Sequence, residues 1–332
     1  MKKYHIFSIS IFLFAFLVYG QHSGAGGTAF PFMNINYDAR SVAMGGAASA
    51  IPNGVYGVLS NPATIGYENN PQVMVGYRPV IMDVWGGPLA YLHPLDEYGN
   101  FALNVVILTS GKLETIDSEG RLTGDIARND NVAGGISWGK ELVEDFAVGV
   151  TLRGYYTRLG FSGNYYTADG VALDGGVQYR MKNGRFITGA AFRNLGFMRR
   201  GFDPDVTYPM PAIFEIGVSY VLEDLDALRF ALDINKKVGD YFNFEPGLEF
   251  TLSENILLRA GYSMSQLDLS KQLDVLRGEK DYNYQKSNMS SLAIGAGFIT
   301  NIENVDLNLD VALQFYSDVS RPAIIVSAIT QF

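Results

Sequence analysis

Hydrophobic side chains alternate with polar or small ones along most of this chain, and few folds satisfy that pattern. In 305–315, every second residue from Val305 onward is hydrophobic or aromatic, whereas Asp306 and Asp310 lie on the other face. A period of two places successive side chains on opposite faces of a β-strand. The chain is therefore predicted to be all-β, with strands that have one apolar face and one face of polar residues and glycine.

Fourteen segments show this alternation, and most are about 9–13 residues long, which suits a tilted strand that crosses a bilayer. The connections between them alternate in length, with the longest at 111–129, 195–210 and 266–287. Outer-membrane barrels have an even strand number, short periplasmic turns and longer outer loops. We therefore predict a 14-stranded antiparallel transmembrane β-barrel over 72–332, with both ends in the periplasm. The predicted strands are 72–80, 84–93, 100–110, 130–140, 145–158, 169–181, 184–194, 211–222, 227–237, 242–251, 255–265, 288–299, 304–315 and 322–332.

A secreted, soluble β-sandwich or propeller would also alternate, and it is the second candidate. Such a sheet exposes its polar face to water and should be rich in Lys and Glu there, whereas only 18% of this chain is charged and 37 of its residues are glycine. The last segment also ends on Phe332, and a terminal aromatic on an alternating strand is what the barrel assembly machinery recognises. Both features favour the barrel, with outer-membrane lipid and that machinery as partners.

The first twenty residues have the layout of a signal peptide. Lys2 and Lys3 precede an apolar run over 6–19, and the small Gly20 precedes Gln21. At about 14 residues, the run is shorter than the ~20 residues of a membrane-spanning helix. We expect 1–20 to be cleaved and the mature chain to reach the outer membrane of a Gram-negative bacterium. An uncleaved N-terminal anchor is the alternative.

Composition and motifs argue against several classes of function. The formal charge is −9, and removal of Lys2 and Lys3 leaves 23 basic against 34 acidic residues, or −11, which disfavours nucleic-acid binding. The chain has no cysteine and three histidines, so a thiolate or histidine metal cluster is not expected. The G-x-S-x-G match at 135–139 lies inside an alternating strand, whereas a nucleophile elbow needs a strand, a sharp turn and a helix. We predict no enzymatic activity, no cofactor and no metal.

Residues 21–71 precede the first strand and lack its alternation. They are rich in Gly and Ala, and Asn53-Gly54 and Asn61-Pro62 are turn formers. Eight strands enclose an interior that side chains fill, but fourteen leave a lumen. We predict that 21–71 forms a hatch inside this lumen; a periplasmic tail is the alternative.

Three stretches of this segment, 27–35, 38–47 and 60–63, resemble the N-terminal signature of the PorV/PorQ family, although Thr64-Ile65-Gly66 replaces the usual continuation of the last stretch. That family consists of 14-stranded outer-membrane barrels with an N-terminal hatch, similar to the FadL-type fatty-acid transporters. The resemblance implies a type IX secretion component that binds exported proteins or secretion partners at the cell surface. The alternative that it implies is a FadL-like channel for hydrophobic small molecules. The residues that carry the motif are Arg40, Gly45, Gly46, Asn61, Pro62 and Ala63.

Charged residues occur on the predicted inner face of many strands. Charges at membrane depth persist only where they pair or meet water. We expect these residues to anchor the hatch and one another; a cation-favouring aqueous path is the alternative. They are Arg78, Arg153, Asp174, Arg180, Glu215, Asp233, Glu245, Glu249, Arg259, Asp306 and Asp310. The long connections 111–129, 195–210 and 266–287 are the predicted partner contacts, and Leu269, Leu273 and Leu276 have helical spacing in the last.

Overall fold

The computed structural model describes residues 27–80, 83–111, 113–161, 164–181, 184–222, 225–240, 242–265, 290–303, 305–316 and 321–332. The predicted leader and the connection 266–287, with its three spaced leucines, lie outside these residues. No helix in the described part of the chain is both long and apolar enough to cross a membrane.

The described residues form fifteen strands, joined in one sheet. Neighbouring strands are antiparallel throughout. The strands are β1 (Gln72–Pro79), β2 (Trp85–Pro94), β3 (Asn100–Thr109), β4 (Leu113–Ile116), β5 (Leu122–Val143), β6 (Phe146–Phe161), β7 (Asn164–Met181), β8 (Phe186–Arg200), β9 (Ile213–Val221), β10 (Leu228–Lys237), β11 (Phe242–Ser253), β12 (Ile256–Ser265), β13 (Ser291–Ile302), β14 (Val305–Tyr316) and β15 (Ala323–Gln331).

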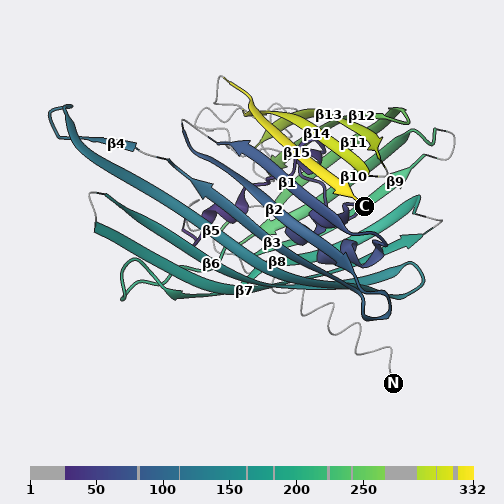
Figure 1. The fold of residues 1–332 in the computed structure, drawn as a ribbon, viewed down its shortest axis with the longest axis horizontal. Coiled ribbons are helices and arrows are strands. Elements are labelled where there is room, and N and C mark those ends of the chain that lie inside the picture. The colour runs from purple at the N-terminus through teal and green to yellow at the C-terminus, as the bar shows by residue number, and fades with distance from the viewer. Residues whose placement is uncertain are drawn as a thin grey trace, which may run out of the picture.

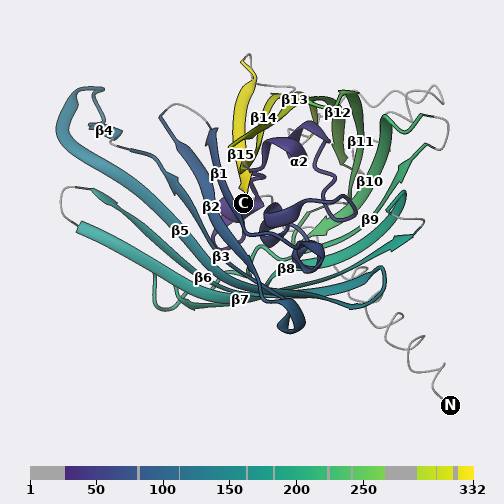
Figure 2. The same ribbon diagram turned by 45° about the vertical axis from the view of Figure 1, so that its right-hand side comes forward.

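The sheet closes on itself and forms a barrel (Figures 1 and 2). β1 pairs with β15, from Gln72 opposite Gln331 to Tyr77 opposite Val326. β3 pairs directly with β5, so β4 lies outside the ring and forms a hairpin with the start of β5. Fourteen strands therefore make the closed barrel, which confirms the predicted number.

Strands β5 to β8 are longer than predicted and extend beyond one rim of the barrel, on the left of Figure 1. The predicted connection 111–129 contains paired strands, because Leu113 pairs with Ala127 and Ile116 with Leu122. Pairing of β6 with β7 also continues from Leu159 opposite Tyr166 to Phe161 opposite Asn164, and pairing of β7 with β8 reaches Arg200. Strand pairing needs only backbone groups, so it persists outside the bilayer, where no apolar face is required and the alternation fades.

The connections at the opposite rim are all short, from the one between β2 and β3 to the turn between β13 and β14. Short turns are periplasmic in outer-membrane barrels. The rim from which β5 to β8 extend is therefore the outer one. At its end, Gly120 donates its backbone N–H to the Asp117 carbonyl over 3.0 Å, which closes the β4–β5 hairpin.

The two faces of the wall differ as the alternation predicts. Leu309 and Val311 are 39% and 43% exposed, whereas Asp310 between them is fully buried inside the barrel. Small residues on the inner face let other backbone come close. A Cβ at Gly149 would lie 2.3 Å from the carbonyl carbon of Pro62, so glycine there makes room for the N-terminal segment.

An arginine on the outer face should therefore be far more costly than one on the inner face. Leu248 lies in the middle of β11 and is 40% exposed. We expect Leu248→Arg to lower the free energy of unfolding by about 2–4 kcal/mol, because a charge near the midplane meets lipid. Ser263 lines a pocket inside the lumen, so Ser263→Arg should lower the free energy of unfolding much less. Denaturant unfolding in lipid vesicles measures both, and equal losses would contradict the assignment of the two faces.

The N-terminal segment, defined here as residues 27–71, lies inside the ring of strands (Figure 2). It contains four short pieces: η1 (Pro31–Asn34), α2 (Ala39–Ala43), η2 (Gly54–Leu59) and η3 (Pro62–Tyr67). A further short helix, η4 (Asp96–Tyr98), lies in the turn between β2 and β3. α2 packs against β12 to β15, and η3 against β5 to β7. Near the outer side, Phe30 stacks on Tyr155 of β6 with ring centroids 5.1 Å apart.

Candidate functional site

An ion-pair network connects α2 to the barrel wall. Arg40 donates from Nε and Nη2 to the two carboxylate oxygens of Glu249 on β11, each over 2.9 Å. Arg259 on β12 donates to Glu249 over 2.8 Å and to Asp310 on β14 over 2.5 Å. Two arginines and two carboxylates thus join the N-terminal segment to three strands.

Asp38 fixes the start of α2. Its side chain accepts hydrogen bonds from the backbone N–H groups of Arg40 and Ser41, at 3.0 and 3.1 Å, as an N-cap residue does. Burial raises the pKa of Asp38, and these hydrogen bonds from Ser41 and Arg40 oppose that rise. The cap places Arg40 in the first turn of α2, where its side chain reaches Glu249.

A second buried pair holds the other side of the segment. Arg153 on β6 donates to Asp174 on β7 over 2.8 Å, and both side chains are almost completely buried. The same guanidinium donates to the carbonyl of Val58 and to the side-chain oxygen of Asn104, each over 2.7 Å. Arg153 therefore joins β6, β7 and β3 to η2.

The remaining anchors use backbone groups of the segment. Asp233 on β10 accepts from the N–H groups of Ala48 and Ser49, both over 2.8 Å. Asn61 donates to the carbonyls of Ser49 and Val177, and its oxygen accepts from the N–H of Ala63. Pro62 follows as the first residue of η3, where its missing N–H is not needed.

Gly45 and Gly46 occupy a crowded turn after α2, and both have positive φ, at 75° and 109°. A Cβ at Gly45 would lie 2.5 Å from the backbone nitrogen of Tyr262 and 2.9 Å from the carbonyl oxygen of Pro246. A Cβ at Gly46 would lie 2.5 Å from the carboxyl carbon of Glu245. The motif glycines therefore let the turn touch the wall directly.

Gly45→Ala should consequently be more damaging than alanine at another glycine of similar backbone conformation. Gly120 has φ 80°, but a Cβ added there would meet nothing within 4 Å, so Gly120→Ala carries the conformational cost alone. We expect Gly45→Ala to lower the free energy of unfolding by about 1–3 kcal/mol more than Gly120→Ala does, since the backbone around Gly45 must move. Unfolding in denaturant, with limited proteolysis of the N-terminal segment, measures this difference. Equal effects would mean that the turn does not pack as tightly as described.

The remaining residues predicted from the sequence lie outside the two ion-pair groups described above. Arg78 donates to the Asn36 carbonyl over 2.7 Å and to Gln314 and Tyr316, and the Arg180 guanidinium lies 3.6 Å from the Tyr67 ring centroid. Asp306 is not in the lumen network; it is exposed beside the turn between β13 and β14 and accepts from Asn301. Phe332 is 54% exposed, and its N–H donates to the Pro71 carbonyl over 3.2 Å.

Sequence reasoning missed two lumen arginines. Arg193 on β8 pairs with Glu215 over 3.0 Å and donates to the Leu59 carbonyl. Arg229 on β10 donates to Ser219 over 3.1 Å. Both lie in phase with inward residues of their strands, Arg193 with Ala191 and Arg229 with Ala231. Extending the alternation to every residue of these two strands would have found them.

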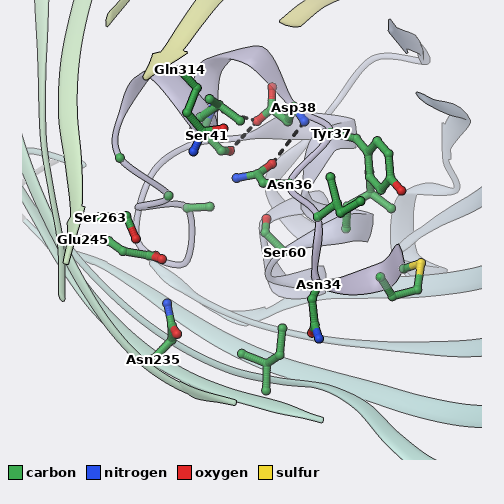
Figure 3. Close-up of a pocket in the computed structure, with 18 of the residues that line it drawn as sticks. Asn34, Asn36, Tyr37, Asp38, Ser41, Ser60, Asn235, Glu245, Ser263 and Gln314 are labelled. Carbon is green, nitrogen blue, oxygen red and sulfur yellow. Dashed lines mark hydrogen bonds between the residues drawn. The ribbon is translucent and has the colours of Figure 1, made fainter. Parts of the chain in front are cut away.

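A pocket of about 330 Å³ lies beside the segment in the outer half of the lumen (Figure 3). It is on the outer side because Arg78, Lys237 and Tyr316, which line it, are at or near the ends of strands that lead to outer connections. Polar side chains face it from both the segment and the wall. Those labelled in Figure 3 include Asn34, Asn36, Ser41, Ser60, Asn235, Glu245, Ser263 and Gln314.

This arrangement defines a class of protein: a closed outer-membrane barrel whose lumen is occupied by its own N-terminal segment, with a pocket in the outer half of the lumen. The described residues contain no group of three or more His, Cys, Asp or Glu side chains placed to hold a metal ion.

Solved structures of this fold include hydrocarbon transporters. The chain is similar to the toluene transporter TodX of Pseudomonas putida, with a TM-score of 0.60 and 15% identity over 94% of this chain and 97% of that one. It is also similar to the monoaromatic hydrocarbon channel CymD, with a TM-score of 0.59 and 14% identity over 89% and 97%. A FadL homologue of Pseudomonas aeruginosa gives 0.52 and 10%, over 93% and 99%. At these identities the likeness establishes the fold.

The family follows from the sequence match. The family model of the type IX secretion system protein PorV matches residues 20–240, which is more than half of the chain. The protein belongs to the PorV family and is a type IX secretion outer-membrane barrel, located in the outer membrane of a Gram-negative bacterium. No curated protein sequence matches it significantly.

Proposed function

We propose that this barrel is a non-enzymatic secretion component that binds exported proteins or secretion partners with its outer face. Membership of the PorV family supports association with type IX secretion components. The observation that carries the proposal is the one-sided extension of β5 to β8 beyond the outer rim. A sheet that projects beyond the outer rim offers a surface to a partner at the cell surface.

The end of this projection carries exposed apolar side chains. Ile116 on β4 and Leu122 at the start of β5 are each 65% exposed and lie opposite each other in the hairpin. They are outside the span of the barrel wall, because the β3–β5 pairing stops at Thr109 and Asp130. Exposed apolar residues beyond the lipid-facing wall favour contact with another protein.

A channel for hydrophobic small molecules is the second candidate, and the fold of TodX favours it. Such a channel needs an apolar path and a segment that can move aside. Here the outer pocket mixes apolar residues such as Met33 and Leu59 with amide, hydroxyl and charged groups, so it is not a continuous apolar path. Buried ion pairs and backbone hydrogen bonds also attach the segment to the wall on several sides. These features favour the partner-binding function.

We also propose that Phe332 serves barrel assembly. It directly follows Gln331, the last residue of β15, beside the seam where β15 pairs with β1, and it is exposed. An exposed terminal aromatic beside the closing seam is accessible to the barrel assembly machinery before the seam closes.

The proposed function is tested by changing the projecting hairpin. A double variant, Ile116→Ser with Leu122→Ser, should capture much less exported protein or secretion component on crosslinking in intact cells. The matched control is Leu142→Ser with Val143→Ser. Leu142 and Val143 lie at the other end of β5, at the periplasmic rim, and are 52% and 64% exposed. Normal capture by the hairpin variant, or equal loss in the control, would contradict binding by this outer face.

A further inference from the structure

The outward-facing side chains of β5 to β8, which lie side by side in the sheet (Figure 1), change from apolar to charged at a common level. Each strand makes this change between two successive outward residues near the outer rim. The changes are from Val132 to Asp130 on β5, Tyr156 to Arg158 on β6, Val171 to Asp169 on β7 and Phe197 to Arg199 on β8. The register aligns these positions, because Asp130 lies opposite Arg158, and Asp169 lies opposite Tyr156 on one side and Arg200 on the other.

This level marks where the lipid-facing wall meets the headgroups of the outer leaflet. On its periplasmic side, Leu152 and Phe197 are 61% and 63% exposed on the outer face of the wall. Charges on this face are costly near the bilayer midplane and cost little near the interface. The pairing of β3 with β5 also stops here, at Thr109 opposite Asp130. Lipid headgroups therefore lie against the charged residues of β5 to β8.

Basic residues outnumber acidic ones at this level. The group is called the rim patch here and consists of Arg128, Asp130, Arg158, Asp169, Arg199 and Arg200. Four arginines against two carboxylates give the patch a formal charge of +2, although the whole chain carries −9. The next acidic residues after β8, Asp203 and Asp205, lie in the connection to β9, where Asp203 accepts the N–H of Asp205. An acidic protein thus presents positive charge where its wall meets the lipid headgroups.

The two carboxylates hold three of the arginines against the wall. Asp130 accepts from Nη2 of Arg158 over 2.7 Å, and the two oxygens of Asp169 lie 2.5 Å from Nε of Arg199 and 3.1 Å from Nε of Arg200. Each contact engages one nitrogen of a guanidinium, which has five N–H donors. The three arginine side chains are 39%, 69% and 55% exposed, so donors remain for a ligand outside the protein.

The arginines form two groups, each with one more positive than negative charge. Arg128 is two residues from Asp130 on the same face of β5, and it makes no ion pair with another described residue. Arg128 and Arg158 therefore lie on either side of Asp130, and Arg199 and Arg200 lie around Asp169. Neighbouring strands are about 4.8 Å apart, so the two groups are separated by about 10–15 Å across the sheet.

We propose that the rim patch binds the phosphate groups of an outer-leaflet lipid, with one phosphate at each group of arginines. Guanidinium groups match phosphate oxygens with paired N–H donors. The apolar wall next to the patch accommodates the acyl chains of the same molecule. The contact holds the β5–β8 side of the barrel at a fixed depth, so that the β4–β5 hairpin extends from the membrane surface. This inference goes beyond the proposed function, because the patch faces lipid and is separate from the hairpin.

The test measures lipid binding to the whole protein in detergent by native mass spectrometry. The probe is lipid A with both phosphates, and the matched probe is the same lipid after removal of its phosphates. The phosphorylated lipid should bind at least about tenfold more tightly, since each arginine near anionic lipid contributes about a fivefold gain in affinity. Its binding should also weaken as the salt concentration rises. This comparison needs no variant, and equal binding of the two lipids would overturn the proposal.

Variants then locate the site. Arg199→Gln with Arg200→Gln should weaken binding of the phosphorylated lipid at least about tenfold. The matched control, Arg121→Gln with Arg185→Gln, removes the same two charges from exposed arginine–carboxylate pairs elsewhere and should leave binding unchanged. Heat-dependent electrophoretic mobility verifies that each variant is a folded barrel. Equal loss in the two double variants, or binding of inorganic phosphate as tight as that of the lipid, would overturn the lipid site.

Crosslinked capture in intact cells distinguishes this proposal from the proposed function. If Arg199→Gln with Arg200→Gln keeps lipid binding and loses capture of partners, the patch contacts an acidic protein and the lipid site is wrong. Loss of capture in the hairpin variant supports the proposed function whatever the lipid measurement gives, so either proposal can fail while the other stands.

Discussion

Replacement of Arg153 by glutamine is expected to lower the free energy of unfolding by about 3–5 kcal/mol. Arg153 and Asp174 are 1% and 2% exposed and lie 2.8 Å apart. The variant leaves the Asp174 charge buried without its partner, and it removes the donors to Val58 and Asn104. Denaturant unfolding in vesicles, followed by the fluorescence of the two tryptophans, measures the loss.

Arg158 provides the matched control, because it lies five residues further along the same strand. It pairs with Asp130 over 2.7 Å, nearly the same distance, but its side chain is 39% exposed. Solvent screens such a pair, so Arg158→Gln should change stability far less. A double variant removes both charges together. Arg153→Met with Asp174→Leu should recover much of the lost free energy of unfolding, since no charge then stays buried. Equal effects at Arg153 and Arg158 would contradict the role given to burial.

The barrel is predictable from the sequence because the bilayer imposes one rule: every strand that crosses it must present an apolar face to the lipid. The expected strands 242–251 and 304–315 end within two residues of β11 and β14. The rule weakens beyond the membrane, where pairing continues without an apolar face. This is why the alternation does not predict the start of β5, from Leu122.

The candidate site is predictable only in part. Alternation identifies which charged residues face inwards, as it does for Arg153, Asp174 and Glu249. It does not say which of them meet. Arg40 and Glu249 are 209 residues apart in sequence, and their contact depends on closure of the barrel and on the path of the N-terminal segment. The same holds for Gly46 and Glu245, whose proximity gives the pocket its shape.

Deletion of 27–68 should convert the closed barrel into an ion-conducting one. Fourteen strands enclose more space than side chains fill, and in this protein the N-terminal segment occupies it. The barrel should still assemble, because Glu249 and Asp310 keep Arg259 as a partner, and water reaches the lumen groups that lose theirs. In planar bilayers, the deletion variant should show discrete conductance steps, whereas the full protein should show none. Cells that carry it should become sensitive to large antibiotics.

The control removes residues from the outer rim and leaves the lumen filled. Deletion of 114–125 shortens the β4–β5 hairpin but keeps the pairing of β3 with β5 and all contacts of the N-terminal segment with the wall. This variant should remain non-conducting and lose partner capture, whereas the 27–68 deletion should conduct. Heat-dependent electrophoretic mobility verifies that each variant is a folded barrel. A folded 27–68 deletion that does not conduct would show that the strands close the lumen by themselves, and a conducting full protein would favour the channel over the partner-binding function.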